Sequence, residues 1–275
     1  MDSQSRIFMR VLSYVRNCIG LLIRLTGRHP KILSDRTSWI QIVKTLQPRE
    51  TGLPLIRIGA QGDGGYLLPD DLKGIKTVIS PGSGGNASFE LELESYGICS
   101  IIVDNNLSQK PLRMPKESTF INKSVSGYDS ENSISLNTLV ELADSTGDLM
   151  LQMDIEGHEY GALNGLNRIH LDRFRIIVIE FHYTFNWVFE HDWRWTYEQI
   201  FSKLLANHVV VHLHANNTGG KFEFAGIIFP NLLEVTLLRK DRIIELGEVI
   251  QVSNKLDFDA DPGRKSIPRK GLGFA

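Results

Sequence analysis

The sequence predicts a doubly wound α/β fold, and three observations lead to this prediction. Short apolar runs alternate with amphipathic helical segments between residues 76 and 213, as they do in folds with a parallel sheet. One run leads into a glycine-rich turn and a helix, the arrangement of nucleotide-binding folds. Another, Leu149–Met153, ends in Asp154, Glu156 and Glu159, and ligands bind beyond the carboxyl ends of parallel strands.

Length and composition fit one large α/β domain with an addition at each end. The chain has 275 residues, 42% of them hydrophobic. Its net charge is −2 and it has no long basic block, so binding of nucleic acid is not expected. We expect a helical extension over residues 1–50, the main domain over 51–252 and an extended tail over 253–275. Cys18 and Cys99 make no disulfide framework, which favours a reducing, cytoplasmic location.

The N-terminal segment is expected to form a basic amphipathic helix. Residues 7–25 are largely apolar, but Arg10, Arg16 and Arg24 interrupt them, which fits neither a membrane-spanning helix nor a signal peptide. The apolar side chains lie towards one face of the helix. We favour packing of residues 6–25 on the domain or on a second copy of the chain, with peripheral binding to an anionic membrane as the alternative.

Two elements are predicted ahead of the glycine-rich turn. The spacing of Trp39, Ile42 and Leu46 places them on one face of a helix over residues 36–46. The Asp-Gly-Gly triplet at 63–65 lies between two short apolar runs and predicts a hairpin. If the loop is functional, its backbone lies close against a ligand. In the simpler interpretation, the loop is only a turn.

The glycine-rich turn, Pro81–Gly85, joins a strand over residues 76–80 to a helix over 86–96. Asn86 is the expected N-cap of that helix and Gly97 its end. Glycines let a backbone approach a ligand, and the first N–H groups of the helix point at it. The cofactor contacts predicted in this turn are Gly82, Ser83 and Gly84.

An acidic residue ends the following strand. Residues 98–103 are apolar and lead into Asp104. An acid about 20 residues beyond a glycine turn, at the end of the second strand, hydrogen-bonds the ribose hydroxyls of a nucleotide cofactor. The alternative is a turn residue, since Asn105 and Asn106 follow, but the spacing favours the cofactor interpretation.

The rest of the chain continues the alternation. Strands are expected over residues 118–125, 148–154, 175–181, 208–213 and 234–239, the last of them paired near 225–229. Helices are expected over residues 136–143, 159–166 and 193–205.

These motifs resemble the FkbM family of S-adenosylmethionine-dependent methyltransferases. The resemblance rests on Gly62-Asp-Gly-Gly-Tyr66, the glycine turn, Asp104 and, above all, Asp154-Ile-Glu-Gly-His-Glu159. It covers roughly residues 55–240 and implies a seven-stranded Rossmann-like sheet, S-adenosylmethionine as cofactor, and O-methylation of a glycan or small metabolite. The turn lacks the acidic residue that often precedes it in such enzymes, so Asp63 or Asp154 is expected to hold the methionine amine.

Polar residues at the ends of two strands are the catalytic candidates for methyl transfer. Asp154, Glu156, Glu180 and His182 follow neighbouring strands, whose ends converge in a doubly wound sheet. We favour His182 as the general base because its reference pKa is nearest neutrality and burial would keep it neutral. Asp154 is the alternative base.

An aromatic stretch after the fifth strand is expected to line the acceptor site. Tyr183 and Trp187 suit the C–H faces of a sugar, although aromatics at helical spacing are more often core. The remaining substrate candidates are His214 and Asn216. Asp154, Glu180, His182 and His214 offer ligands for a divalent metal, but without a tight local spacing a metal is not favoured and no ligand is assigned.

Two other functions are compatible with the same strand–turn–helix unit. A nicotinamide-dependent oxidoreductase would predict a full G-x-G-x-x-G, and here the third small residue, Ala87, is displaced. A non-catalytic nucleotide- or glycan-binding module would bind ligand without turnover.

Overall fold

The computed structural model describes residues 15, 33–106, 108, 110–143, 146–189, 191, 195–250 and 254–267. The helix expected over residues 6–25 lies outside this part of the chain, apart from Val15, as does everything beyond residue 267. Within the described part, no helix combines the length and the hydropathy that crossing a membrane requires.

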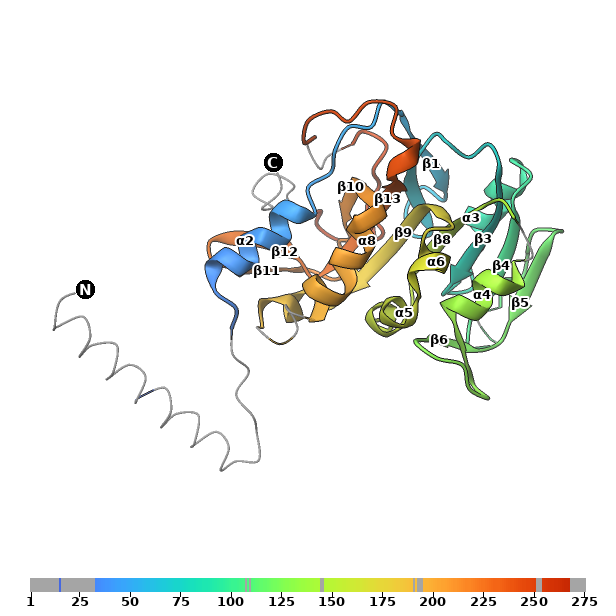
Figure 1. The fold of residues 1–275 in the computed structure, drawn as a ribbon, viewed down its shortest axis with the longest axis horizontal. Coiled ribbons are helices and arrows are strands. Elements are labelled where there is room, and N and C mark those ends of the chain that lie inside the picture. Colours follow the sequence, from blue (N-terminus) through green and yellow to red (C-terminus); the bar gives the residue numbers. More distant parts are fainter. Residues whose placement is uncertain are drawn as a thin grey trace.

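A seven-stranded sheet forms the centre of the fold (Figure 1). From one edge to the other its strands are β10 (His208–Ala215), β13 (Leu232–Arg239), β9 (Phe174–His182), β8 (Asp148–Met153), β3 (Ile75–Pro81), β4 (Cys99–Val103) and β5 (Ser118–Ile121). Only β13 runs against its neighbours. The chain moves outward from β3 to β5 and then returns to place β8 on the other side of β3. The switch point of the sheet therefore lies between β3 and β8, where such folds bind their ligands.

Strand β13 is the main departure from the predicted topology. It was expected to pair near residues 225–229, but β12 (Ile227–Pro230) pairs only with β11 (Lys221–Phe224) in a separate hairpin. Strand β13 instead inserts between β9 and β10. Its side chains are buried along most of its length, which suits a central strand with neighbours on both sides.

Helices cover one face of the sheet, and a hairpin and a helix cover the other (Figure 1). The first face packs against α2 (Arg36–Thr45), α4 (Leu136–Leu142), α5 (Glu159–Gly165) and α8 (Ser202–Asn207). The second packs against the hairpin of β1 (Leu55–Gly59) and β2 (Gly65–Pro69) and against α3 (Ser88–Glu94). The remaining elements are β6 (Ser124–Ser126), β7 (Ser133–Ser135), α6 (Arg168–Leu171), the 3-10 helices η2 (Thr184–Val188) and η4 (Lys240–Arg242), and the π-helix η3 (Trp195–Phe201).

Three elements differ from the sequence prediction within the described residues. Asn86 is not the N-cap of α3: the helix begins at Ser88, and the Asn86 side chain accepts a hydrogen bond from the Ser88 N–H in a tight turn before it. The strand expected over 118–125 is divided between β5 and β6, which belong to different sheets. The helix expected to begin at residue 193 is described from Trp195 and is π-helical as far as Phe201.

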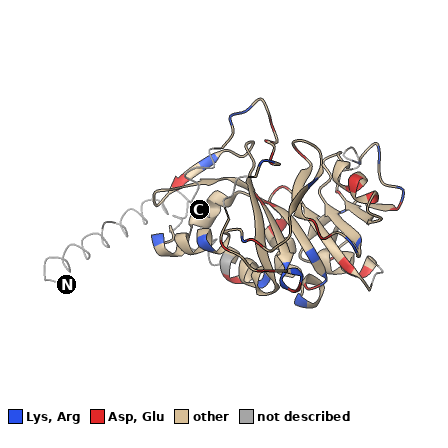
Figure 2. Ribbon diagram, turned by 90° about the horizontal axis from the view of Figure 1, so that it is seen from above, with Lys and Arg blue, Asp and Glu red and all other residues tan. Residues whose placement is uncertain are grey.

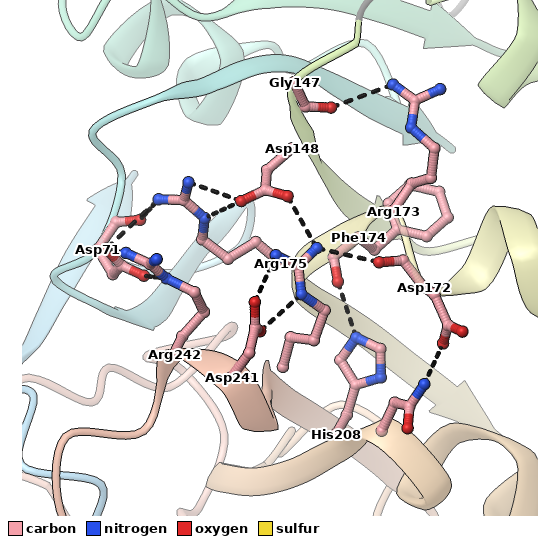
Figure 3. Close-up of polar contacts among 12 residues, drawn as sticks. Asp71, Gly147, Asp148, Asp172, Arg173, Phe174, Arg175, His208, Asp241 and Arg242 are labelled. Atoms are coloured by element: carbon pink, nitrogen blue, oxygen red, sulfur yellow. Dashed lines mark hydrogen bonds and ion pairs between the residues drawn. The ribbon is translucent and has the colours of Figure 1, made fainter.

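Ion pairs join the ends of three central strands, β8, β9 and β13, on the side of the sheet opposite the candidate site (Figure 3). Asp148, at the start of β8, has one carboxylate oxygen 2.7 Å from Arg175 Nη2 and the other 2.8 Å from Arg239 Nη1. Arg175 also contacts Asp71, which in turn pairs with Arg242. These contacts link β8, β9 and β13 to the loop that follows β2.

The C-terminal segment, residues 254–267, packs on the domain rather than extending away from it as expected. Asn217 makes two hydrogen bonds to the backbone of Asp261, one from its Nδ2 and one to its Oδ1. Arg57 donates to the Leu256 carbonyl and stacks over the Phe258 ring. Backbone groups of this segment thus provide hydrogen-bond partners for the side chains of Asn217 and Arg57.

Candidate active site

Three cavities meet at Asp154, directly beyond the end of β8. Their volumes are about 200, 70 and 310 Å³, and Asp154 lines all three. The first two also share Gly82 and Gly84, and the last two share Asp63. The site thus forms at the switch point, with one carboxylate common to its three parts.

The first cavity contains the residues predicted to hold a ribose. Asp104 lines it with only 6% of its surface exposed, and it accepts hydrogen bonds from Ser83 Oγ (3.2 Å) and the Asn106 N–H (3.0 Å). Val103, Val125 and Ile155 supply apolar walls, which would suit an adenine ring.

Gly82 brings the glycine turn close against the end of β8. Its φ is +86°, and a Cβ at this position would lie 1.5 Å from the Asp154 carbonyl oxygen. Only glycine allows both the backbone conformation and the approach. The turn and the D-x-E-G-x-E motif, distant in sequence, are therefore in direct contact.

The second cavity contains an acid that the sequence analysis missed. It is lined by Asp63, Ser83 and Glu90 among others, and Glu90 lies on the buried face of α3 beside Phe89. Glu90 Oε2 is buried without a hydrogen-bond partner among the described residues, and burial raises the pKa of this carboxyl. The signal in the sequence was a carboxylate on the apolar face of a helix, next to the glycine turn. Glu90 offers the acidic partner for an amine that the turn itself lacks.

The third cavity brings together all four predicted catalytic residues. Asp154, Glu156, Glu180 and His182 line it, together with Asp63. His182 Nε2 lies 3.3 Å from Glu156 Oε2 and 3.7 Å from Asp154 Oδ1. The switch-point geometry therefore assembles the cluster from the ends of two adjacent strands, β8 and β9.

Glu159 fixes the orientation of the cluster, and it was absent from the predicted site. Its side chain is fully buried, and its Oε1 lies 3.1 Å from His182 Nδ1. The same oxygen accepts hydrogen bonds from the backbone N–H groups of Ile155 and Gly157. The last acid of the motif thus holds both the imidazole ring and the turn that precedes α5.

The carboxylates of this cluster change the expected protonation of His182. Burial alone would lower the pKa of His182, but the hydrogen bond to Glu159 and the charges of Glu159, Asp154 and Glu156 outweigh it and raise that pKa. The expectation that burial keeps His182 neutral is therefore wrong. Burial, reinforced by Glu156, Glu159 and Asp63, raises the pKa of Asp154 to about 7, although His182 opposes the shift. Burial and Asp154 also raise the pKa of Glu180.

The glycine of the motif makes room for an aromatic ring over the site. Gly157 has a φ of +98°, and a Cβ there would lie 2.6 Å from the Tyr183 ring. Tyr183 lines the third cavity and remains 54% exposed, so it is placed as a wall that a substrate could contact. Glu156 and Tyr183 both adopt left-handed backbone conformations, with φ of 56° and 55°.

Two predicted substrate residues lie away from the cavity. Trp187 is 1% exposed and packs against Phe181, Phe201 and Phe229, so it belongs to the core. His214 is buried, with Nδ1 3.7 Å from a carboxylate oxygen of Asp257 in the C-terminal segment.

Asn216, the third of these candidates, does line the cavity, and its Nδ2 donates to Glu180 Oε1 at 3.1 Å. The cavity wall also includes Ala260, from the segment expected to be a free tail.

A family model of methyltransferases matches the middle of the chain. Residues 94–220 match the family model described as the Methyltransferase FkbM domain. The match agrees with the family resemblance that the motifs indicated. The match includes Asp104 and the whole D-x-E-G-x-E motif, and it favours methyl transfer over the nicotinamide-dependent alternative.

The chain is similar to several solved structures at low sequence identity. The antibiotic-resistance methyltransferase Kmr is 13% identical with a TM-score of 0.33, covering 67% of this chain and 100% of that one. The spermidine synthase from Thermotoga maritima is 11% identical with a TM-score of 0.35, covering 78% and 86%. The N-terminal domain of EvdMO1, solved in the presence of SAH and D-fucose, is 10% identical with a TM-score of 0.33, covering 75% and 97%. No curated protein matches the chain.

Proposed function

We propose that this protein transfers the methyl group of S-adenosylmethionine to a hydroxyl oxygen of a glycan or small metabolite. The observation that carries the proposal is the position of Asp154 at the junction of three cavities. Two of them suit the two ends of the cofactor, and the third suits an acceptor. The methyl group would then lie beside Asp154 and face the third cavity.

The cofactor is assigned to the first two cavities. Asp104 accepts hydrogen bonds from the ribose hydroxyls, and the apolar residues beside it enclose the adenine. The methionine end occupies the smaller cavity, where Glu90 and Asp63 are the acids available to its amine. The glycine turn passes between the two cavities and supplies backbone N–H groups.

The acceptor hydroxyl is assigned to the third cavity. Its oxygen attacks the methyl carbon as the carbon–sulfur bond breaks, which leaves neutral S-adenosylhomocysteine, and the hydroxyl proton passes to a carboxylate of the cluster. Asp154 and Glu156 both lie near the junction and could take it. Much of the rate would come from holding the two reactants in line.

The character of the third cavity supports a small polar acceptor rather than a nucleic acid. Its described lining includes four carboxylate side chains, those of Asp63, Asp154, Glu156 and Glu180, which would repel a phosphate backbone. Figure 2 shows basic and acidic residues interspersed along the molecule. Hydroxyl groups of a sugar can donate to such carboxylates, and Tyr183 offers an aromatic face.

Calorimetry followed by a methyl-transfer assay tests the proposal. The full-length protein should bind S-adenosylmethionine and S-adenosylhomocysteine but not NAD. With labelled S-adenosylmethionine, label should enter hydroxylated sugars or metabolites from an extract. Replacing a carboxylate that could take the hydroxyl proton, in Asp154→Asn or Glu156→Gln, should lower the rate by ~10²–10⁴-fold. Label recovered only on nitrogen, or binding without transfer to any acceptor, would refute O-methylation.

A further inference from the structure

Three side chains where β8 and β9 end form a set of metal ligands. Asp154, Glu180 and His182 each offer one donor atom, and these three atoms lie within 4.8 Å of one another. His182 Nε2 and Asp154 Oδ1 are 3.7 Å apart. Adjacent donors bound to one ion at about 2.1–2.3 Å are roughly 3 Å apart, so small side-chain movements would complete the set.

One carboxylate oxygen in this set lacks the donor that its burial calls for. Asp154 Oδ1 is buried and has no hydrogen-bond partner among the described residues. Glu180 is only 4% exposed and lines the cavity, and the one hydrogen bond it accepts from the described residues comes from Asn216 to Oε1. Buried oxygens are normally satisfied by a donor, by water or by a cation, and a cation shared with Glu180 would satisfy Asp154 Oδ1.

The neighbouring side chains orient the donors as they do around bound metals. Glu159 Oε1 lies 3.1 Å from His182 Nδ1, which leaves Nε2 facing Asp154. A carboxylate behind the ring is the usual partner of a metal-binding histidine. Asn216 holds Glu180 in the same way. His214, the fourth ligand candidate in the sequence, lies beside Asp257 instead.

The negative charge of the third cavity also favours a bound cation. Its described lining contributes the carboxylates of Asp63, Asp154, Glu156 and Glu180, against His182 as the only basic side chain. Glu180 is buried and Asp154 is half-buried, and carboxylates in such positions are stable only when protonated, paired or bound to a cation. One divalent ion between Asp154, Glu180 and His182 would offset half of the formal charge of these four carboxylates.

We propose that Asp154, Glu180 and His182 bind one divalent cation of the Mg²⁺ and Mn²⁺ class. Two oxygens to one nitrogen, with positions left open toward the cavity, match the preference of these ions. The open positions would hold hydroxyl oxygens of the acceptor, a role that rests on the proposed function. Glu156, whose side chain is 83% exposed, is then the carboxylate left to take the hydroxyl proton.

The test uses the full-length protein, stripped with chelator, and Mn²⁺ as the probe. The electron paramagnetic resonance signal of free Mn²⁺ should fall until one ion is bound per chain, and Mg²⁺ should displace it. Spin-echo spectra of bound Mn²⁺ should show coupling to a single imidazole nitrogen. Glu180→Gln and His182→Ala should each weaken Mn²⁺ binding at least about tenfold. Glu234→Gln, which removes a carboxylate opposite Glu180 on β13, is the matched control and should bind Mn²⁺ like the wild type.

The outcomes separate the ion site from the proposed function. Absence of saturable Mn²⁺ binding, or of nitrogen coupling in the wild-type spectrum, overturns the ion site even if the variants fail to fold. So does binding that survives in both folded ligand variants. S-adenosylhomocysteine binding, measured separately by calorimetry, belongs to the proposed function alone. Its failure with Mn²⁺ binding intact would remove the methyltransferase role and leave the ion site standing.

Discussion

Glu159 Oε1 lies 3.1 Å from Nδ1 of His182, and this contact joins the start of α5 to the end of β9. The carboxylate is fully buried and also accepts hydrogen bonds from the N–H groups of Ile155 and Gly157. One side chain therefore fixes the imidazole ring, the turn after β8 and the approach of two strands at the site. Glu159 acts through the groups it positions, because it does not line the cavities.

Replacing Glu159 should destabilise the protein. Glu159→Ala leaves two partly buried backbone N–H groups and a buried histidine nitrogen without their partner, and an unsatisfied buried group costs about 1–3 kcal/mol. Glu159→Gln keeps an oxygen acceptor and should recover much of the loss. Chemical denaturation measures both free energies of unfolding, with Glu131→Ala, at an exposed position, as the control. Equal stability of Glu159→Ala and wild type would show that the turn holds without this carboxylate.

Removing Asp104 should weaken cofactor binding while leaving the fold intact. We expect Asp104→Ala to lower the affinity for S-adenosylhomocysteine by ~1.5–3 kcal/mol, the range for hydrogen bonds to a charged group. Isothermal titration calorimetry gives the value directly, and Asp70→Ala, an exposed acid whose side chain lines none of the three cavities, should bind like the wild type. Unchanged affinity in a folded Asp104→Ala protein would take this residue out of the cofactor site.

The parts of the fold that the sequence predicted are those fixed by local patterns. The strand, glycine turn and helix around Gly82, and the strand that ends in Asp104, depend on neighbours within a few residues. The meeting of Asp154 with His182 also followed from the sequence, since the ends of adjacent parallel strands converge at one edge of the sheet.

The parts that were missed depend on contacts between distant segments. The insertion of β13 between β9 and β10 is a choice of pairing partner, which apolar content does not specify. Trp187 looked like a loop residue, but its ring fills the core beneath β9. The raised pKa of His182 has the same origin, because it depends on carboxylates that only folding brings beside the ring.

Acid should lower the free energy of unfolding of the protein, because Asp148 becomes protonated and loses its ion pairs. Burial raises the pKa of Asp148, but hydrogen bonds to Arg239 and Arg175 outweigh it and hold the pKa below its ordinary value. A depressed folded-state pKa gives stability that is present above the unfolded pKa, about 3.9, and is lost as the pH falls through the folded pKa.

Asp148→Asn should therefore be less stable than the wild type at pH 7, by roughly 1.5–3 kcal/mol, and should lose less stability on acidification. Urea unfolding at a series of pH values between about 7 and 3 measures the two slopes. The exposed Asp70→Asn is the matched control and should reproduce the wild-type slope. If the free energies of unfolding of Asp148→Asn and the wild type fell equally with pH, the ion pairs of Asp148 in Figure 3 would not determine the loss of stability in acid.

The C-terminal segment should control access to the acceptor cavity through Asn217. Its side chain binds both the carbonyl (2.7 Å) and the N–H (3.0 Å) of Asp261, and the neighbouring Ala260 lines the third cavity but neither of the other two. Asn217→Ala removes both hydrogen bonds, about 1 kcal/mol each, so the segment should detach more readily. If the third cavity binds the acceptor, the KM for the acceptor should rise by up to about 30-fold, the factor that corresponds to about 2 kcal/mol. The affinity for S-adenosylhomocysteine should stay near the wild-type value, because its assigned cavities do not include the segment.

Steady-state kinetics with a defined acceptor, combined with calorimetry, separates the effect on the acceptor from the effect on the cofactor. The exposed Asn132→Ala should change neither the KM nor the cofactor affinity. A parallel loss of cofactor affinity would indicate general loosening of the domain, and an unchanged KM would mean that the segment is not a wall of the acceptor site.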